Sequence, residues 1–165
     1  MMEKAGVSFS GYAPGVIGEI TRCHAVYYNR HWGFDKTFEI QVAGELASFI
    51  EGFDPICDGL WVAGNGSAFI GSVAVDGHST EPQLARLRWF IVEPEFQGRG
   101  IGSALIEKAV AFAVRRRFKG LFLWTFEGLN RAKSLYERHG FRLSLEHDVD
   151  QWGRSIREQR FDLII

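Results

Sequence analysis

The 165-residue sequence has little of what a disulfide-bonded, membrane-spanning or polyanion-binding protein needs. Its two cysteines, Cys23 and Cys57, are too few for a disulfide framework and form no CxxC pair. No apolar run reaches the roughly 18 residues that span a membrane, and the N-terminus carries no signal pattern. A formal net charge of −1 gives no bias toward a polyanionic partner. We therefore expect a cytoplasmic protein that binds neither membrane nor nucleic acid.

Repeats, low-complexity tracts and linkers rich in Pro, Gly and Ser are also missing from the sequence. With 46% hydrophobic residues the chain can bury one core, so we expect a single domain over residues 1–165. A homodimer is compatible with this composition. Both cysteines stand near apolar residues, which indicates reduced core or near-core positions. Four histidines, at positions 31, 78, 139 and 147, show no metal-ligand spacing, which predicts that no metal is bound.

Turn and cap residues divide the chain into an ordered series of helices and strands. Pro14 suits the first turn of a helix, Asp35 can cap the next one, and Gly120 is expected to end the helix that follows residue 101. The expected order is a strand at 7–12, helices at 15–33 and 36–53, strands at 59–64, 68–75 and 83–92, the helix from 101, a strand at 121–126, a helix at 129–140, and a hairpin of 141–149 with 155–165. This order predicts a mixed α/β sheet, mostly antiparallel, with one parallel βαβ crossover in its middle and helices on both faces.

The stretch EPEFQGRGIG, residues 93–102, joins the apolar run LRWFIV to an amphipathic helix. A strand that runs into a glycine loop and a helix N-terminus offers unpaired N–H groups and the positive end of the helix dipole. Gly98, Gly100 and Gly102 remove the Cβ atoms that would keep an anion away. The loop therefore predicts a phosphate or pyrophosphate site, although a tight turn without a ligand is the alternative.

Two common phosphate-binding loops fit this stretch poorly. A Rossmann fingerprint would have a glycine where Ser103 stands, and it would follow the strand without the intervening EPEFQ, although Glu127 does lie after the next strand. A Walker A loop is excluded because no Gly-Lys-Ser/Thr follows.

Two segments resemble the signatures of the GCN5-related N-acetyltransferase (GNAT) family. FIVEPEFQGRGIG resembles its acyl-CoA-binding motif, with the Q/R-x-x-G-x-G core at Gln97, Gly100 and Gly102, and LNRAKSLYERHGFR is similar to its second signature. Both lie within residues 84–142. LWTFEGL and QWGRSIREQRF look most like the acetyltransferase domains that are often fused to MarR-type regulators. The resemblance implies the acyl-CoA N-acyltransferase fold, acetyl-CoA as cosubstrate, and direct acetyl transfer to a primary amine of a small molecule or peptide. A module that binds or senses CoA without turnover is the alternative.

The resemblance also implies roles for individual residues. Backbone groups of Phe90, Ile91 and Val92 would hold the pantetheine arm and the thioester carbonyl. Tyr136 matches the general acid that protonates the CoA thiolate, while Leu129 stands where the family often has an asparagine. The pyrophosphate would bind main-chain N–H groups of a seven-residue loop, to which Arg99 would add charge: Gln97, Gly98, Arg99, Gly100, Ile101, Gly102 and Ser103.

No motif specifies the proton acceptor or the acceptor pocket. Glu127, expected at the mouth of the cleft, is the best-placed carboxylate for a general base, and Glu93 is another, with a surface role as the alternative for both. His24, Tyr27 and Tyr28 lie on the first long helix, where this family commonly builds the acceptor pocket, and we expect them to line the substrate site. Small amines, amino acids, polyamines, aminoglycosides and protein N-termini all remain open as acceptors.

Overall fold

The computed structural model describes residues 6–165, and within them the expected series of helices and strands is present. The strands are β1 (Ser8–Ser10), β2 (Gly59–Asn65), β3 (Ala68–Asp76), β4 (Leu84–Val92), β5 (Gly120–Phe126), β6 (Arg142–Gln151) and β7 (Arg154–Ile164). The helices are α1 (Val16–Trp32), α2 (Lys36–Glu51), α3 (Ile101–Arg115) and α4 (Asn130–Arg138), with a short 3₁₀ turn at Pro94–Phe96. None of the helices in this part of the chain is long and apolar enough to cross a membrane.

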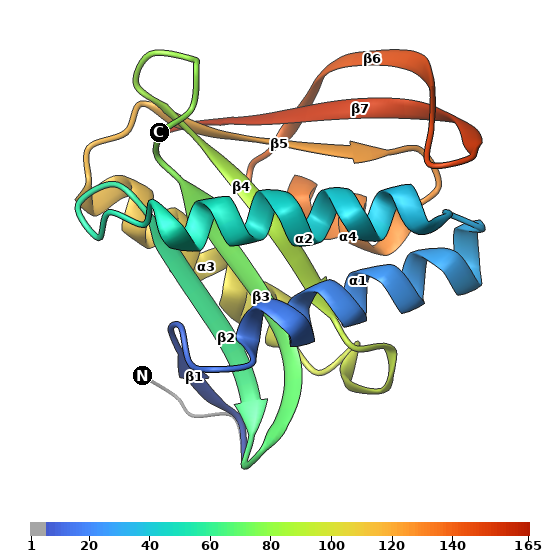
Figure 1. Cartoon of the computed structure of the whole chain (residues 1–165). Helices are drawn as coiled ribbons and strands as arrows, with labels where there is room; N and C mark the ends of the chain where they lie inside the picture. Colours follow the sequence, from blue (N-terminus) through green and yellow to red (C-terminus); the bar gives the residue numbers. More distant parts are fainter. Residues whose placement is uncertain (1–5) are drawn as a thin grey trace.

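The strands form one sheet in the order β1-β2-β3-β4-β5-β7-β6. Only the β4–β5 pair is parallel, and α3 makes the crossover between these two strands. Helices α1 and α2 lie on one face of the sheet and α3 lies on the other (Figure 1). This architecture confirms the predicted fold class.

Local sequence signals account for the end of α1 and the start of α2 but not for the end of α3. The Asp35 side chain accepts a hydrogen bond of 2.9 Å from the N–H of Thr37 and caps α2, while Gly33 ends α1 in a left-handed conformation with φ 69°. The expectation that Gly120 ends α3 is wrong. The helix stops at Arg115, and Gly120 is the first residue of β5, where an added Cβ would lie 2.5 Å from the carbonyl oxygen of Leu163. Close strand pairing, not helix termination, requires this glycine.

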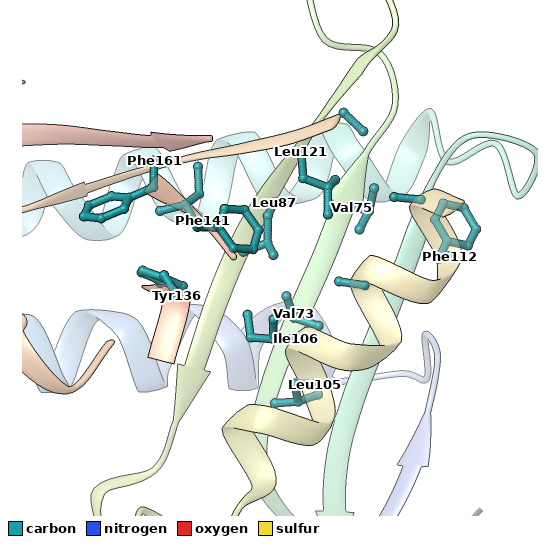
Figure 2. Close-up of a cluster of buried hydrophobic side chains, with 14 of the residues drawn as sticks. Val73, Val75, Leu87, Leu105, Ile106, Phe112, Leu121, Tyr136, Phe141 and Phe161 are labelled. Carbon is teal, nitrogen blue, oxygen red and sulfur yellow. The ribbon is translucent and has the colours of Figure 1, made fainter. Parts of the chain in front are cut away.

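The α3 face of the sheet carries the larger apolar core. Leu105, Ile106 and Phe112 project from α3 toward side chains of β3, β4 and β5 (Figure 2). Tyr136, at one end of this cluster, packs with Phe141 and Phe161 at ring-centroid distances of 6.0 Å. A second cluster, rich in aromatic residues, fills the space between the sheet and helices α1 and α2. Apolar burial on both faces holds the two ends of the sheet together.

The middle of the sheet opens after a short parallel ladder. Strands β4 and β5 pair only at Leu84–Arg86 with Gly120–Phe122 and then diverge (Figure 1). On its other side β4 has an irregularity in its register with β3, and there Trp89 has a positive φ of 46°. The divergence leaves the β5-facing edge of β4 without a partner strand over residues 87–92.

Candidate active site

Two cavities lie where β4 and β5 separate. The first, called here the glycine-loop cleft, has a volume of about 720 Å³ and lies between the end of β4, the loop before α3, and α4. The second, called here the α2 pocket, has a volume of about 410 Å³ and lies between α2 and strands β4, β5 and β7. Four residues line both cavities: Tyr28, Phe90, Leu129 and Tyr136. These residues form the junction between the cavities.

The glycine-loop cleft presents unpaired backbone donors. Gly98 and Gly100 both have φ 76°, a conformation that side chains with a Cβ adopt at a cost. The N–H of Ala104 donates to the Gly100 carbonyl at 3.1 Å, whereas the N–H groups of Gly98, Gly100, Ile101, Gly102 and Ser103 have no backbone acceptor within residues 6–165. A helix N-terminus with such groups suits a pyrophosphate.

Gly102 serves a different purpose from its two neighbours. A Cβ at this position would lie 3.2 Å from both Leu135 and Phe90, so the glycine allows α3 to pack closely against α4 and β4. Ile101 is buried in the core and lines neither cavity. Ser103 lines the cleft, and its hydroxyl lies 2.8 Å from Nε2 of His139.

Two polar side chains fix the glycine loop from either side. Gln97 donates from Nε2 to the Val92 carbonyl at 3.0 Å and accepts from Arg131 at 3.1 Å. The Arg131 guanidinium also lies 3.8 Å from where a Cβ of Gly98 would stand, so a positive charge lies beside the loop. We expected Arg99 to add the positive charge of the loop. Its guanidinium lies over the ring of Phe96 at 5.2 Å, and the residue does not line the cleft. The sequence offered no signal for Arg131 except its place in the second signature helix.

Tyr136 reaches the junction from α4. The residue is 6% exposed, its ring centroid lies 5.8 Å from that of Phe90, and it lines both cavities. Burial raises the pKa of its hydroxyl well above the ordinary value of 10.0, so the phenol is fully protonated at neutral pH. Tyr136 can therefore pack in the core and also contact a molecule bound in either cavity.

His24 lines the α2 pocket, and its surroundings favour the neutral imidazole with the proton on Nδ1. It is 6% exposed, and its Nδ1 lies 2.8 Å from the carbonyl oxygen of Ile20, which only an N–H can satisfy. Burial lowers the pKa of the imidazole from 6.5 to about 4, against the opposing effect of that hydrogen bond. Nε2 is consequently an acceptor at neutral pH. The other two predicted substrate residues also lie at the cavities: Tyr27 lines the glycine-loop cleft, and Tyr28 lies at the junction.

The carboxylates are placed differently from the sequence expectation. Glu127 is exposed, lines neither cavity, and its N–H donates to the Arg157 carbonyl at 2.8 Å. Glu93 forms an ion pair of 2.8 Å with Arg22 and also lines neither cavity. Glu158, on β7 opposite Phe126, does line the α2 pocket. Sequence reasoning missed Glu158 because it lies in REQR, four consecutive polar residues, which give no sign that one face of the strand is covered. The role of Glu127 as a base stays a prediction.

The two cysteines and the residues that could bind a metal ion lie outside the two cavities. Cys23 is buried and Cys57 is half-buried, and neither lines a cavity. Desolvation raises the pKa of the Cys23 thiol to about 12 and that of Cys57 to about 11. Cys57 lies 3.7 Å from Nε2 of His78, and two groups that share this histidine could hold a metal ion: Asp54, Cys57 and His78, and Asp58, Asp76 and His78. The prediction that no metal is bound stays a prediction.

Residues 57–143 match the family model for the acetyltransferase (GNAT) domain. An uncharacterized N-acetyltransferase of Methanocaldococcus jannaschii is 30% identical over 136 residues, which is 80% of this chain and 59% of that protein. The chain thus spans less than two thirds of the length of this curated relative.

Solved structures share the fold over nearly the whole chain. An acetyltransferase from Streptococcus agalactiae superposes with a TM-score of 0.77 at 21% identity, covering 98% of this chain and 100% of that one. An acetyltransferase from Salmonella typhimurium, solved with its cofactor acetyl-CoA, has a TM-score of 0.72 at 13% identity over 96% of this chain and 94% of that one. With a family match over more than half of its residues, this chain belongs to the GNAT acetyltransferase family.

Proposed function

We propose that this protein is an N-acetyltransferase that moves the acetyl group of acetyl-CoA directly to a primary amine. The observation that carries the proposal is the junction of two cavities at Tyr28, Phe90, Leu129 and Tyr136. In a direct transfer both substrates must reach the same reaction point, each from its own cavity. The opening between β4 and β5 lets the two cavities meet at such a point. A module that only binds CoA would need the glycine-loop cleft alone.

Acetyl-CoA would occupy the glycine-loop cleft. The N–H groups of Gly98, Gly100, Ile101, Gly102 and Ser103 and the Arg131 guanidinium would bind its pyrophosphate. The free edge of β4 over Phe90, Ile91 and Val92 would bind the pantetheine arm, although the Val92 carbonyl is already engaged by Gln97. The acetyl-CoA bound to the Salmonella relative supports this choice of ligand.

The acceptor amine would enter through the α2 pocket and attack the thioester carbon. As the C–N bond forms, the C–S bond breaks, and the Tyr136 hydroxyl would donate its proton to the departing sulfur. The acceptor would react as its free amine, and the positively charged nitrogen formed by the attack would lose its proton to the neutral imidazole of His24, which lines the α2 pocket. That proton would then pass through water to the Tyr136 oxygen, which restores both groups. The raised thiol pKa values of Cys23 and Cys57, neither of which lines the two cavities, support transfer without a cysteine intermediate.

Free-thiol release from acetyl-CoA tests the activity against a panel of primary amines. Thermal unfolding with and without the ligand tests binding separately: acetyl-CoA at a hundred times its dissociation constant adds about 2.7 kcal/mol, which is several degrees of melting temperature. NADH serves as the control and should give no shift. Absence of a shift at millimolar acetyl-CoA would overturn the proposal. The likeness to acetyltransferase domains fused to MarR-type regulators stays a prediction.

A further inference from the structure

Arg86 lies on the α2 face of the sheet and, unlike Arg88 and Arg160 on the same face, forms no ion pair within residues 6–165. It lies on β4 opposite Phe122 of β5 and lines the α2 pocket. Its Nε is buried and makes no hydrogen bond to any residue of the described chain, 6–165. No ion pair among these residues includes its guanidinium either. Burial lowers the pKa of Arg86, as does the neighbouring charge of Arg88.

The neighbouring arginines are all neutralised within the protein. Arg88 pairs with Glu45 and, at 3.1 Å, with Asp76, and it lies over the ring of Trp89. Arg160 pairs with Glu81 and Asp162. The carboxylates of Glu45, Asp76 and Glu158 favour the charge of Arg86, but none of them forms an ion pair with it, and its buried Nε donor has no acceptor among the residues that the structure describes. An acceptor for this donor is therefore expected to come from outside the chain.

We propose that the acceptor is a small amine that carries a carboxylate, such as an amino acid, and that Arg86 binds the carboxylate. The inference depends on the proposed acetyl transfer, since it identifies the substrate class of the same pocket. A guanidinium forms two parallel hydrogen bonds with a carboxylate, which orients the molecule as well as binding it. With its carboxylate at Arg86, the acceptor would direct its amine toward the junction.

The other charges of the pocket favour a carboxylate over a phosphate. Glu45 and Glu158 line the same cavity and lie close enough to Arg86 to affect its pKa. A phosphate dianion would meet stronger repulsion from these two groups than a single negative charge would. Phe38, Trp124 and Trp152 supply an aromatic wall for the body of the acceptor.

Matched amines test the proposal through kcat/KM for thiol release. β-Alanine and propylamine share one chain length and differ in the carboxylate, phosphoethanolamine carries a phosphate one atom further from the amine, and L-phenylalanine and phenethylamine differ only in the carboxylate. We expect each carboxylate to raise kcat/KM by about 10- to 100-fold, the range of a hydrogen bond to a charged group. A preference for the amines without a carboxylate would overturn the inference and leave acetyl transfer standing. A preference for phosphoethanolamine would overturn the choice of carboxylate.

Substitutions separate a binding role from a structural one. Arg86→Met should remove the carboxylate preference through KM, with little change for phenethylamine, and Arg86→Lys should restore part of it. Without a substrate, Arg86→Met should unfold at the same or a higher temperature, because it removes a buried donor that has no acceptor in the described part of the chain. Arg160→Met, the matched control at a paired arginine that lines neither cavity, should lose stability and keep the preference. Arg86→Met that loses stability and keeps the preference would show Arg86 to be structural.

Binding without turnover distinguishes failure of this inference from failure of the proposed function. Calorimetric titration of L-phenylalanine into the protein with CoA should give binding that Arg86→Met abolishes. Such binding without acetyl transfer to any amine would overturn the proposed enzymatic function and support the carboxylate site. Acetyl transfer to amines without any binding of the carboxylate would overturn the carboxylate site and support the enzymatic function.

Discussion

The Ser72 hydroxyl donates a buried hydrogen bond of 2.7 Å to the carbonyl oxygen of Trp89, across the point where the register of β3 and β4 shifts. Trp89 has a positive φ at this point, which a bulky side chain adopts only when its surroundings enforce it. Ser72 is completely buried. One hydroxyl therefore helps to hold the irregular segment of β4 beside the junction of the two cavities.

Ser72→Ala should destabilise the protein and weaken acetyl-CoA binding. Loss of the donor leaves the Trp89 carbonyl buried without this partner, which costs about 1 to 3 kcal/mol. Urea unfolding and calorimetric titration of acetyl-CoA measure the two effects. Ser48→Ala, on the exposed side of α2, is the control and should change neither. Unchanged stability of Ser72→Ala would mean that other contacts hold the irregular segment.

Gly100→Val should abolish acetyl-CoA binding while most of the fold is retained. The valine side chain would resist the φ of 76° and would stand among the unpaired N–H groups that begin α3. Gly44→Val, at an exposed position of α2 with no atom within 4 Å of an added Cβ, is the matched control. Unchanged affinity of Gly100→Val in a calorimetric titration would place the phosphates elsewhere.

Tyr136→Phe should lower kcat without a comparable loss of acetyl-CoA affinity. The phenyl ring keeps the packing against Phe90, Phe141 and Phe161, while the proton donor is lost. A positioned acid contributes roughly 10²- to 10⁴-fold, and the low end is expected because the CoA thiolate is a good leaving group. Steady-state kinetics with an accepted amine, and Tyr12→Phe at an exposed position as control, decide the question. Unchanged kcat would assign Tyr136 to the core alone.

His24 should make the stability of the protein depend on pH between its two pKa values. Above pH 6.5 the imidazole is neutral in both states, and below that value the unfolded chain gains a proton that the native state accepts only near pH 4. The free energy of unfolding should therefore fall by up to about 3 kcal/mol as the pH decreases from 6.5 to 4. Urea unfolding at a series of pH values measures it. His24→Asn should lose most of this slope, and an identical slope in both proteins would contradict the assignment.

Activity should show no inflection from His24 near its ordinary pKa. Since the native imidazole stays neutral down to about pH 4, kcat/KM between pH 5 and 9 should follow the ionisation of the acceptor amine. Two acceptors with different amine pKa values should therefore give two shifted profiles. A shared inflection near pH 6.5 would indicate a different proton acceptor.

The fold could be predicted because its signals are local. Asp35, Gly33 and Gly153 mark helix ends and a turn, and strand lengths follow from short apolar runs. The conformation of the glycine loop could also be predicted, since Gly98 and Gly100 have the positive φ that their spacing suggests. The reason for a glycine at position 102 could not be predicted, because Leu135 and Phe90, which leave little room for a side chain there, approach it only in the folded chain.

The α2 pocket was mostly hidden from sequence reasoning. Arg86 occupies an alternating polar position, typical of the solvent-facing side of a strand, and Glu158 lies in a run of four polar residues. They line a cavity because α2 covers this face while β4 and β5 diverge beneath it. Neither condition has a local signature. Glu127 illustrates the opposite case, since its place after β5 suggested the mouth of the cleft, whereas the side chain is exposed outside both cavities.

The short seam between β4 and β5 has a mechanical consequence. The pairs from Leu84–Gly120 to Arg86–Phe122 form the whole ladder between β4 and β5, to which the N–H of Lys119 adds one bond of 2.9 Å to the Gln83 carbonyl, whereas β5 pairs with β7 along its whole length. Apart from this ladder, apolar contacts and single polar contacts, such as that of Arg160 with Glu81, connect the two parts of the sheet. A molecule bound in the opening would connect β4 to β5 where no ladder does, so we expect the sheet to be stiffer with a ligand bound than without one.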